Sequence, residues 1–185
     1  LTDGDFSVSK TVSVTQKSAL SIEYKLTVTP AVMNEILKAE AEKHPDATSS
    51  DYFEVDATFQ AVATDGSGKT VDVKMHANQM YVTDLSESSF RMRGKFYCSQ
   101  SVGFVKKVVI SANSTVSTGN WASLAIKFSK DGSSWSNLPS TAITSEGKVS
   151  TVVNTDEDNT YFSIDASGGY STLYVDNFEV TFIGE

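Results

Sequence analysis

The chain has 185 residues, of which 39% are hydrophobic and 21% charged, and its formal net charge is −8 at pH 7. This composition is typical of a globular protein and excludes an intrinsically disordered chain. The negative charge repels phosphate backbones and anionic lipid, and no run of about 18 apolar residues could cross a bilayer, so we expect neither a nucleic-acid partner nor membrane insertion. The length favours one domain over residues 1–185, with a division into 1–101 and 102–185 as the alternative.

Alternation of apolar and polar residues predicts β-strands from one end of the chain to the other. The first clear case is residues 20–28, and residues 53–61 and 71–75 flank the turn Asp65–Gly68 as a predicted hairpin. Further strands are predicted at 6–14, 80–83, 90–98, 104–111, 123–129, 148–153, 161–165 and 173–183. About ten short strands indicate an all-β fold, which we expect to be an antiparallel β-sandwich of jelly-roll type.

One segment has helical spacing instead. Val32, Met33, Ile36 and Leu37 recur at intervals of three and four residues, Thr29 is a candidate N-cap, and Pro30 suits the first helical position. We therefore predict a single short helix over residues 30–44, covering an open end or edge of the strands.

Residues that could carry catalysis are few. Of the two histidines, His44 is interpreted as a cation at the helix end and His76 as a solvated strand residue, while the lone Cys98 is interpreted as a small buried hydrophobic side chain. Glu54 and Asp56 share one strand face and are similar to the alternating acid triplet of jelly-roll glucanases, but Thr58 stands at the third position. Because a retaining glycosidase needs both a nucleophile and an acid, we expect no enzyme.

Two acidic segments are candidates for calcium, which prefers oxygen ligands. The stretch 154–159 lacks the spacing of a calcium loop and is interpreted as a solvated turn. Asp176 is in phase with Tyr174, Phe178, Val180 and Phe182, so its carboxylate is predicted to point inward. A buried carboxylate needs a partner, which leaves calcium, a lysine, backbone N–H groups or a strand bulge that turns the side chain outward.

Residues 102–185 resemble the galactose-binding-like jelly rolls found among carbohydrate-binding modules of secreted bacterial proteins. The likeness lies in a strand at 104–112, in the hairpin segment from Leu124 through Ser129-Lys130-Asp131-Gly132 to Trp135, and in the closing strand 173–182. The resemblance implies a non-catalytic module that binds glycan through aromatic rings and a few polar groups. It also implies a structural calcium ion, with Asp176 and either Asp3 or Asp5 as ligands.

The expected glycan contacts follow from this resemblance and from the turns beside the tryptophans. They are Trp121, Trp135, Tyr170, Asn120 and Asp131. Sugar C–H faces stack on aromatic rings, whereas the structural alternative, which we favour slightly, is that each tryptophan closes one end of the fold. We expect a carbohydrate-binding module of a secreted or cell-surface protein, with polysaccharide and other domains of a larger protein as partners. The alternative is a structural or adhesive domain of a surface protein.

Overall fold

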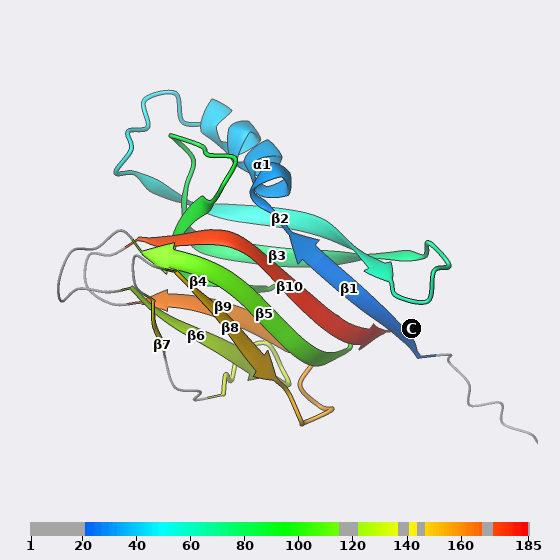
Figure 1. The fold of residues 1–185 in the computed structure, drawn as a ribbon. Coiled ribbons are helices and arrows are strands. Elements are labelled where there is room, and N and C mark those ends of the chain that lie inside the picture. Colours follow the sequence, from blue (N-terminus) through cyan, green and yellow to red (C-terminus); the bar gives the residue numbers. More distant parts are fainter. Residues whose placement is uncertain (1–20, 115–121, 137–140, 144–146, 168–171, 185) are drawn as a thin grey trace, which may run out of the picture.

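The computed structural model describes residues 21–114, 122–136, 141–143, 147–167 and 172–184. These residues form one helix and ten strands (Figure 1). The elements are β1 Ile22–Val28, α1 Pro30–Glu42, β2 Tyr52–Ala63, β3 Thr70–Tyr81, β4 Phe90–Cys98, β5 Phe104–Ser114, β6 Ala122–Ser129, β7 Thr141–Ile143, β8 Lys148–Val153, β9 Tyr161–Ser167 and β10 Leu173–Gly184.

The strands pair in an antiparallel manner throughout the described residues, which confirms the prediction of an all-β protein with one short helix. Their order is β7-β6-β9-β4-β3-β2-β1-β10-β5-β8. The first residues of β4 also pair with β10, whereas its last residues pair with β9. Strands on both sides of Ser101 therefore hydrogen-bond to one another. The predicted strand at 6–14 lies outside the described residues.

The predicted hairpin is present as β2 and β3, with Phe59 opposite Val73. The prediction of a separate strand at 80–83 was wrong, because β3 runs without interruption to Tyr81. A bulge between Ala77 and Met80, where two residues of β3 lie opposite Glu54 of β2, shifts the alternation, and the Asn78 side chain within it accepts a 2.6 Å hydrogen bond from the Lys95 amide. The bulge made one long strand look like two in the sequence.

Helix α1 begins as its sequence predicts. The Thr29 hydroxyl accepts a hydrogen bond from the Val32 amide, and Pro30 occupies the first turn. Met33 and Leu37 are fully buried against the strands, and Figure 1 shows α1 on the β2 side of the molecule, away from β8. The helix ends at Glu42 with Lys43 as its C-cap, which confirms the prediction of a single short helix near residues 30–44. No helix in the described part of the chain is long and apolar enough to cross a membrane.

Phenylalanine rings from strands that are not neighbours in the strand order contact one another. The Phe96 ring on β4 lies edge-on to Phe178 on β10, at 5.9 Å between centroids, and to Phe59 on β2, at 6.2 Å. Cys98 is buried in the same core, as expected for a structural thiol, and burial raises the pKa of Cys98 to about 12. The core thus contains aromatic rings from β2, β4 and β10 in contact with one another.

Candidate functional site

The structure describes three of the eight side chains predicted to bind glycan or metal: Trp135, Asp131 and Asp176. The others lie outside the described residues. These are Asn120, Trp121 and Tyr170 among the predicted glycan contacts, and Asp3 and Asp5 among the predicted calcium ligands.

Asp131 orders the turn that carries Trp135. Its Oδ1 accepts the backbone N–H groups of Ser133 and Ser134, at 2.8 and 2.7 Å, and the hydroxyl of Ser129 at 3.1 Å. The hydrogen bonds from Ser134 and Ser133 hold the pKa of Asp131 well below its usual range. After this turn Trp135 forms a β-bridge with Ser129 at the end of β6. The Asp131 side chain therefore has a structural role in positioning the indole.

Trp135 is half-buried and belongs to a line of three rings. Its ring lies edge-on to Tyr97 of β4, with centroids 6.0 Å apart and an interplanar angle of 67°. Tyr97 in turn lies 5.6 Å from the ring of His76 on β3, tilted by 58°. We call Trp135, Tyr97 and His76 the aromatic line. Because neighbouring rings are tilted against each other, the aromatic line is stepped and has no single flat face.

Strand register explains why these rings meet. His76 is opposite Tyr97, Tyr97 is opposite Ser163 of β9, and Ser163 is opposite Lys127 of β6. On the other side His76 is opposite Asp56 of β2. These residues alternate with core residues along their strands, so they form one row on the outward side of five strands. The row was missed in the sequence because it depends on register between strands and not on any local motif.

His76 is held by two carboxylates rather than solvated. Its Nδ1 lies 2.7 Å from Asp56 Oδ1, and its Nε2 lies 3.7 Å from Glu54 Oε1. A carboxylate only accepts, so Nδ1 carries the proton toward Asp56. The imidazole itself is mostly covered, whereas Glu54 and Asp56 are exposed and offer oxygens to a ligand.

A buried polar network supports the aromatic line from the neighbouring strands. Ser163 and Asp165 of β9 are only 1% and 7% exposed, although they lie on the outward side. The Ser163 hydroxyl donates to Asp165, and Lys127 Nζ lies 3.0 Å from the other carboxylate oxygen. A buried carboxylate with a cation and a hydroxyl donor is satisfied, so this part of the surface is rigid.

A cleft of about 430 Å³ opens beside Trp135, with Lys130, Asp131, Asp156 and Asn159 in its lining. Lys130 forms ion pairs with Asp156 at 2.9 Å and with Asp158 at 3.4 Å. The ion pair with Lys130 and the backbone N–H of Asp158 lower the pKa of Asp156. The acidic stretch is thus a turn, as interpreted from the sequence, and its carboxylates are engaged by a lysine.

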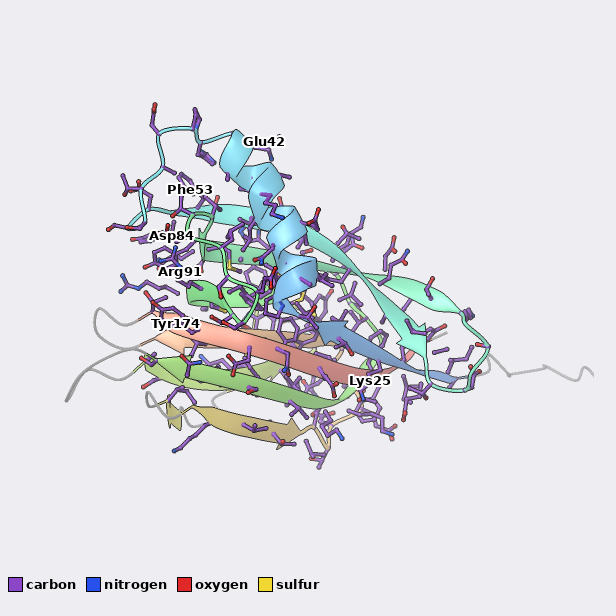
Figure 2. All side chains as sticks on the ribbon, turned by 45° about the horizontal axis from the view of Figure 1, so that its top comes forward. Lys25, Glu42, Phe53, Asp84, Arg91 and Tyr174 are labelled. Carbon is purple, nitrogen blue, oxygen red and sulfur yellow. The ribbon has the colours of Figure 1, made fainter. Side chains whose placement is uncertain are left out.

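A cleft of about 420 Å³ is lined by His44, Tyr52 and Phe53, and two further clefts also lie away from the aromatic line. One of about 870 Å³ is lined by residues at both ends of the described chain, among them Ser21, Phe104 and Gly184. The other, of about 370 Å³, lies over β1, β5 and β10, where Lys25 (labelled in Figure 2) forms an ion pair with Glu179 at 3.3 Å. The cleft beside Trp135 differs from these clefts because it adjoins three aromatic rings in mutual contact, so we take the aromatic line as the candidate site.

Asp176 does not point into the core, so the prediction of an inward carboxylate was wrong. Val175 is opposite Ala112, but Asn177 is opposite Ser111, which leaves Asp176 as the extra residue of a bulge. Its carboxylate accepts hydrogen bonds from Ser111 Oγ at 3.1 Å and from Asn113 Nδ2 at 3.3 Å. The bulge was one of the alternatives open from the sequence. It puts Asp176 and the half-buried Tyr174 (labelled in Figure 2) out of phase with the buried Phe178.

No group of three histidine, cysteine or acidic side chains within the described ranges could hold a metal ion. Calcium binding by Asp176 with Asp3 or Asp5 stays a prediction, since the last two residues lie outside those ranges.

Comparisons of the chain with protein-family models, with curated proteins and with solved structures found no match. The site must therefore be interpreted from its own geometry.

Proposed function

We propose that this protein is a non-catalytic carbohydrate-binding module of a secreted or cell-surface bacterial protein. The observation that carries the proposal is the aromatic line of Trp135, Tyr97 and His76 on the outward side of the strands. Aromatic rings bind sugars because the apolar C–H face of a pyranose packs on a π-face, and hydroxyls need polar partners at the margin.

The polar partners are in place around the rings. Glu54 and Asp56 are exposed beside His76, and Asp156 and Lys130 line the cleft beside Trp135. Carboxylates accept hydrogen bonds from sugar hydroxyls, and an ammonium group donates to sugar oxygens. The arrangement offers both kinds of contact within one surface.

The stepped geometry favours one type of glycan. Rings tilted by 58° and 67° to one another present no common plane, so they do not match the flat face of a crystalline polysaccharide. They suit a single soluble chain whose residues can each meet one ring. We therefore propose soluble glycan chains as the ligand class.

We further propose that residues 1–185 form one β-sandwich of jelly-roll type. The two layers would be β1-β10-β5-β8 and β2-β3-β4-β9-β6-β7, facing each other through Phe59, Phe96 and Phe178. Support comes from the edge-on ring contacts between β4 and β10 and from the strand pairs that cross Ser101.

A second candidate is a structural or adhesive domain of a surface protein. It is favoured by β8, which pairs only with β5 among the described strands and carries two exposed valines. An exposed strand edge of this kind is a common route to protein contacts.

The test is a glycan array combined with pull-downs on soluble and crystalline polysaccharides, run with calcium and with a chelator. Trp135→Ala and Tyr97→Ala should each weaken binding of the soluble ligand about fivefold, since one ring contact is worth about 1 kcal/mol. Tyr52→Ala is the matched control, because Tyr52 is an exposed aromatic residue of β2 outside the aromatic line.

Two results would count against the proposal. Absence of binding across a broad panel, from protein shown to be folded, would favour the adhesive alternative. Binding that survives loss of both Trp135 and Tyr97 would place the glycan on another surface.

A further inference from the structure

Strand β8 lies at the margin of the strand order. Residues Lys148 to Val153 pair with Ala112 to Lys107 of β5 in an unbroken register, and no other described strand pairs with β8. Figure 2 shows β8, in gold, as the outermost ribbon beside β5. Its second edge presents backbone N–H and C=O groups that no described residue satisfies by strand pairing.

The outward side of β8 is apolar and unprotected. Val149 and Val153 are 68% and 63% exposed, more than any other large hydrophobic side chain in the described part of the chain. Natural edge strands are normally protected by charges, proline or a bulge. Between Val149 and Val153 the strand has none of these, and the only residue separating the valines on that side is Thr151.

The backbone polarity of β8 follows from one hydrogen bond. The Asn154 amide donates to the Lys106 carbonyl of β5 at 2.9 Å. Because alternate residues of a strand direct their N–H and C=O groups to opposite edges, Val149, Thr151 and Val153 direct theirs away from β5. The same three residues that expose their side chains on the outward side therefore also carry the free backbone groups.

We propose that β8 pairs in an antiparallel manner with β8 of a second copy of this chain, about a two-fold axis at Thr151. In this register Thr151 lies opposite its own counterpart, and Val149 lies opposite Val153 of the other copy. Both are hydrogen-bonded pairs, because they use the free backbone groups. The exposed valines then cover each other as cross-strand neighbours on one side of the joined strands.

Charge at the strand ends agrees with this register. Lys148 lies opposite Asn154 of the other copy, two residues before the turn Asp156–Asp158, in which Asp156 and Asp158 share Lys130 and the sum of charges stays negative. Each two-fold related end repeats the contact, as an isologous interface requires. The pairing thus brings opposite charges together although the whole chain carries a net charge of −8. A second copy is the occupant that this self-complementary pattern fits.

The first experiment is sedimentation equilibrium of the chain 1–185 over a concentration series. The wild-type chain should show a reversible monomer–dimer equilibrium, and the double variant Val149→Lys/Val153→Lys should be monomeric at the same concentrations. Val62→Lys is the matched control, because Val62 is 48% exposed on β2, which is not an edge strand, and this variant should dimerise as the wild type does. Circular dichroism checks that all three remain folded.

The second experiment tests the register. In a hydrogen-bonded antiparallel pair the opposed Cα atoms are about 5.5 Å apart, which suits a disulfide. Thr151→Cys should therefore form a covalent dimer on mild oxidation, whereas Val149→Cys alone should not and should cross-link to Val153→Cys when the two variants are mixed. A wild-type chain that stays monomeric, a dimer that persists in the double lysine variant, or equal cross-linking of Val149→Cys and Thr151→Cys would each overturn the proposal.

Discussion

Asn154, at the turn that follows β8, offers a sharp test of the contacts around the cleft. Its side chain is 7% exposed and makes four hydrogen bonds. Nδ2 donates to the Val105 carbonyl at 2.7 Å and to the Asp156 carbonyl at 3.0 Å. Oδ1 accepts from the Asp156 amide at 3.1 Å and from Asn159 Nδ2 at 3.2 Å. This one amide therefore connects β5 to the turn that carries Asp156 into the cleft.

The expected loss follows from these contacts. At about 0.5 to 1.5 kcal/mol net per hydrogen bond, and with the buried Val105 carbonyl losing a donor, Asn154→Ala should lower the free energy of unfolding by about 2–4 kcal/mol. Asn154→Asp has nearly the same shape but lacks both donors and places carboxylate oxygen against two carbonyls. It should lose about as much as the alanine variant.

Urea unfolding followed by circular dichroism measures both losses as shifts of the midpoint at constant slope. Thr155→Ala is the control, because Thr155 is exposed in the same turn and its loss should cost less than about 0.5 kcal/mol. The reasoning is refuted if Asn154→Asp unfolds within about 0.5 kcal/mol of the wild type, since its shape is retained and only the donors are gone.

Three further predictions concern thiol reactivity, acid stability and calcium. Burial raises the pKa of Cys98 to about 12, so the thiol should not react with a thiol reagent at pH 8 in the folded protein. The same thiol should react fully in urea. Fast labelling of the folded protein would contradict the burial of Cys98. The pKa of Asp131 is lowered on folding, so its stabilising contribution is present above the ordinary pKa of about 4 and is lost as the pH falls below it. Asp131→Asn should therefore show a smaller fall in Tm from pH 6 to pH 3 than the wild type, and an equal fall would contradict the assignment. If Asp176 and Asp3 or Asp5 hold calcium, calcium should raise the Tm of the wild type but not of Asp176→Asn, and equal Tm values with calcium and with a chelator would exclude the site.

The strands were predictable from the sequence because apolar and polar side chains alternate along a half-buried strand. The helix start was predictable from Thr29 and Pro30, whose capping roles are local. Bulges were harder to locate, since the extra residue is identified only by its partner strand. Those in β3 and β10 therefore led to a wrong strand division and to a wrong orientation of Asp176.

The candidate site was only partly predictable for the same reason. The turn Asp131-Gly132 before Trp135 is a local motif, and the sequence singled out both Asp131 and Trp135. Tyr97 and His76 come from two other strands and meet Trp135 only through register. The hydrogen bond between His76 and Asp56 likewise needs both strands in place, so the sequence alone suggested a solvated imidazole.

The most direct test of the central claim is to map the glycan on the folded protein. Isotope-labelled protein is titrated with the soluble oligosaccharide that binds best in the screen, and chemical-shift changes are followed by NMR. The proposal predicts that the largest changes fall on Trp135, Tyr97 and His76 and on their neighbours Glu54 and Asp56. Changes confined to the outward side of β1, β5 and β10, around Lys25 and Glu179, would contradict it.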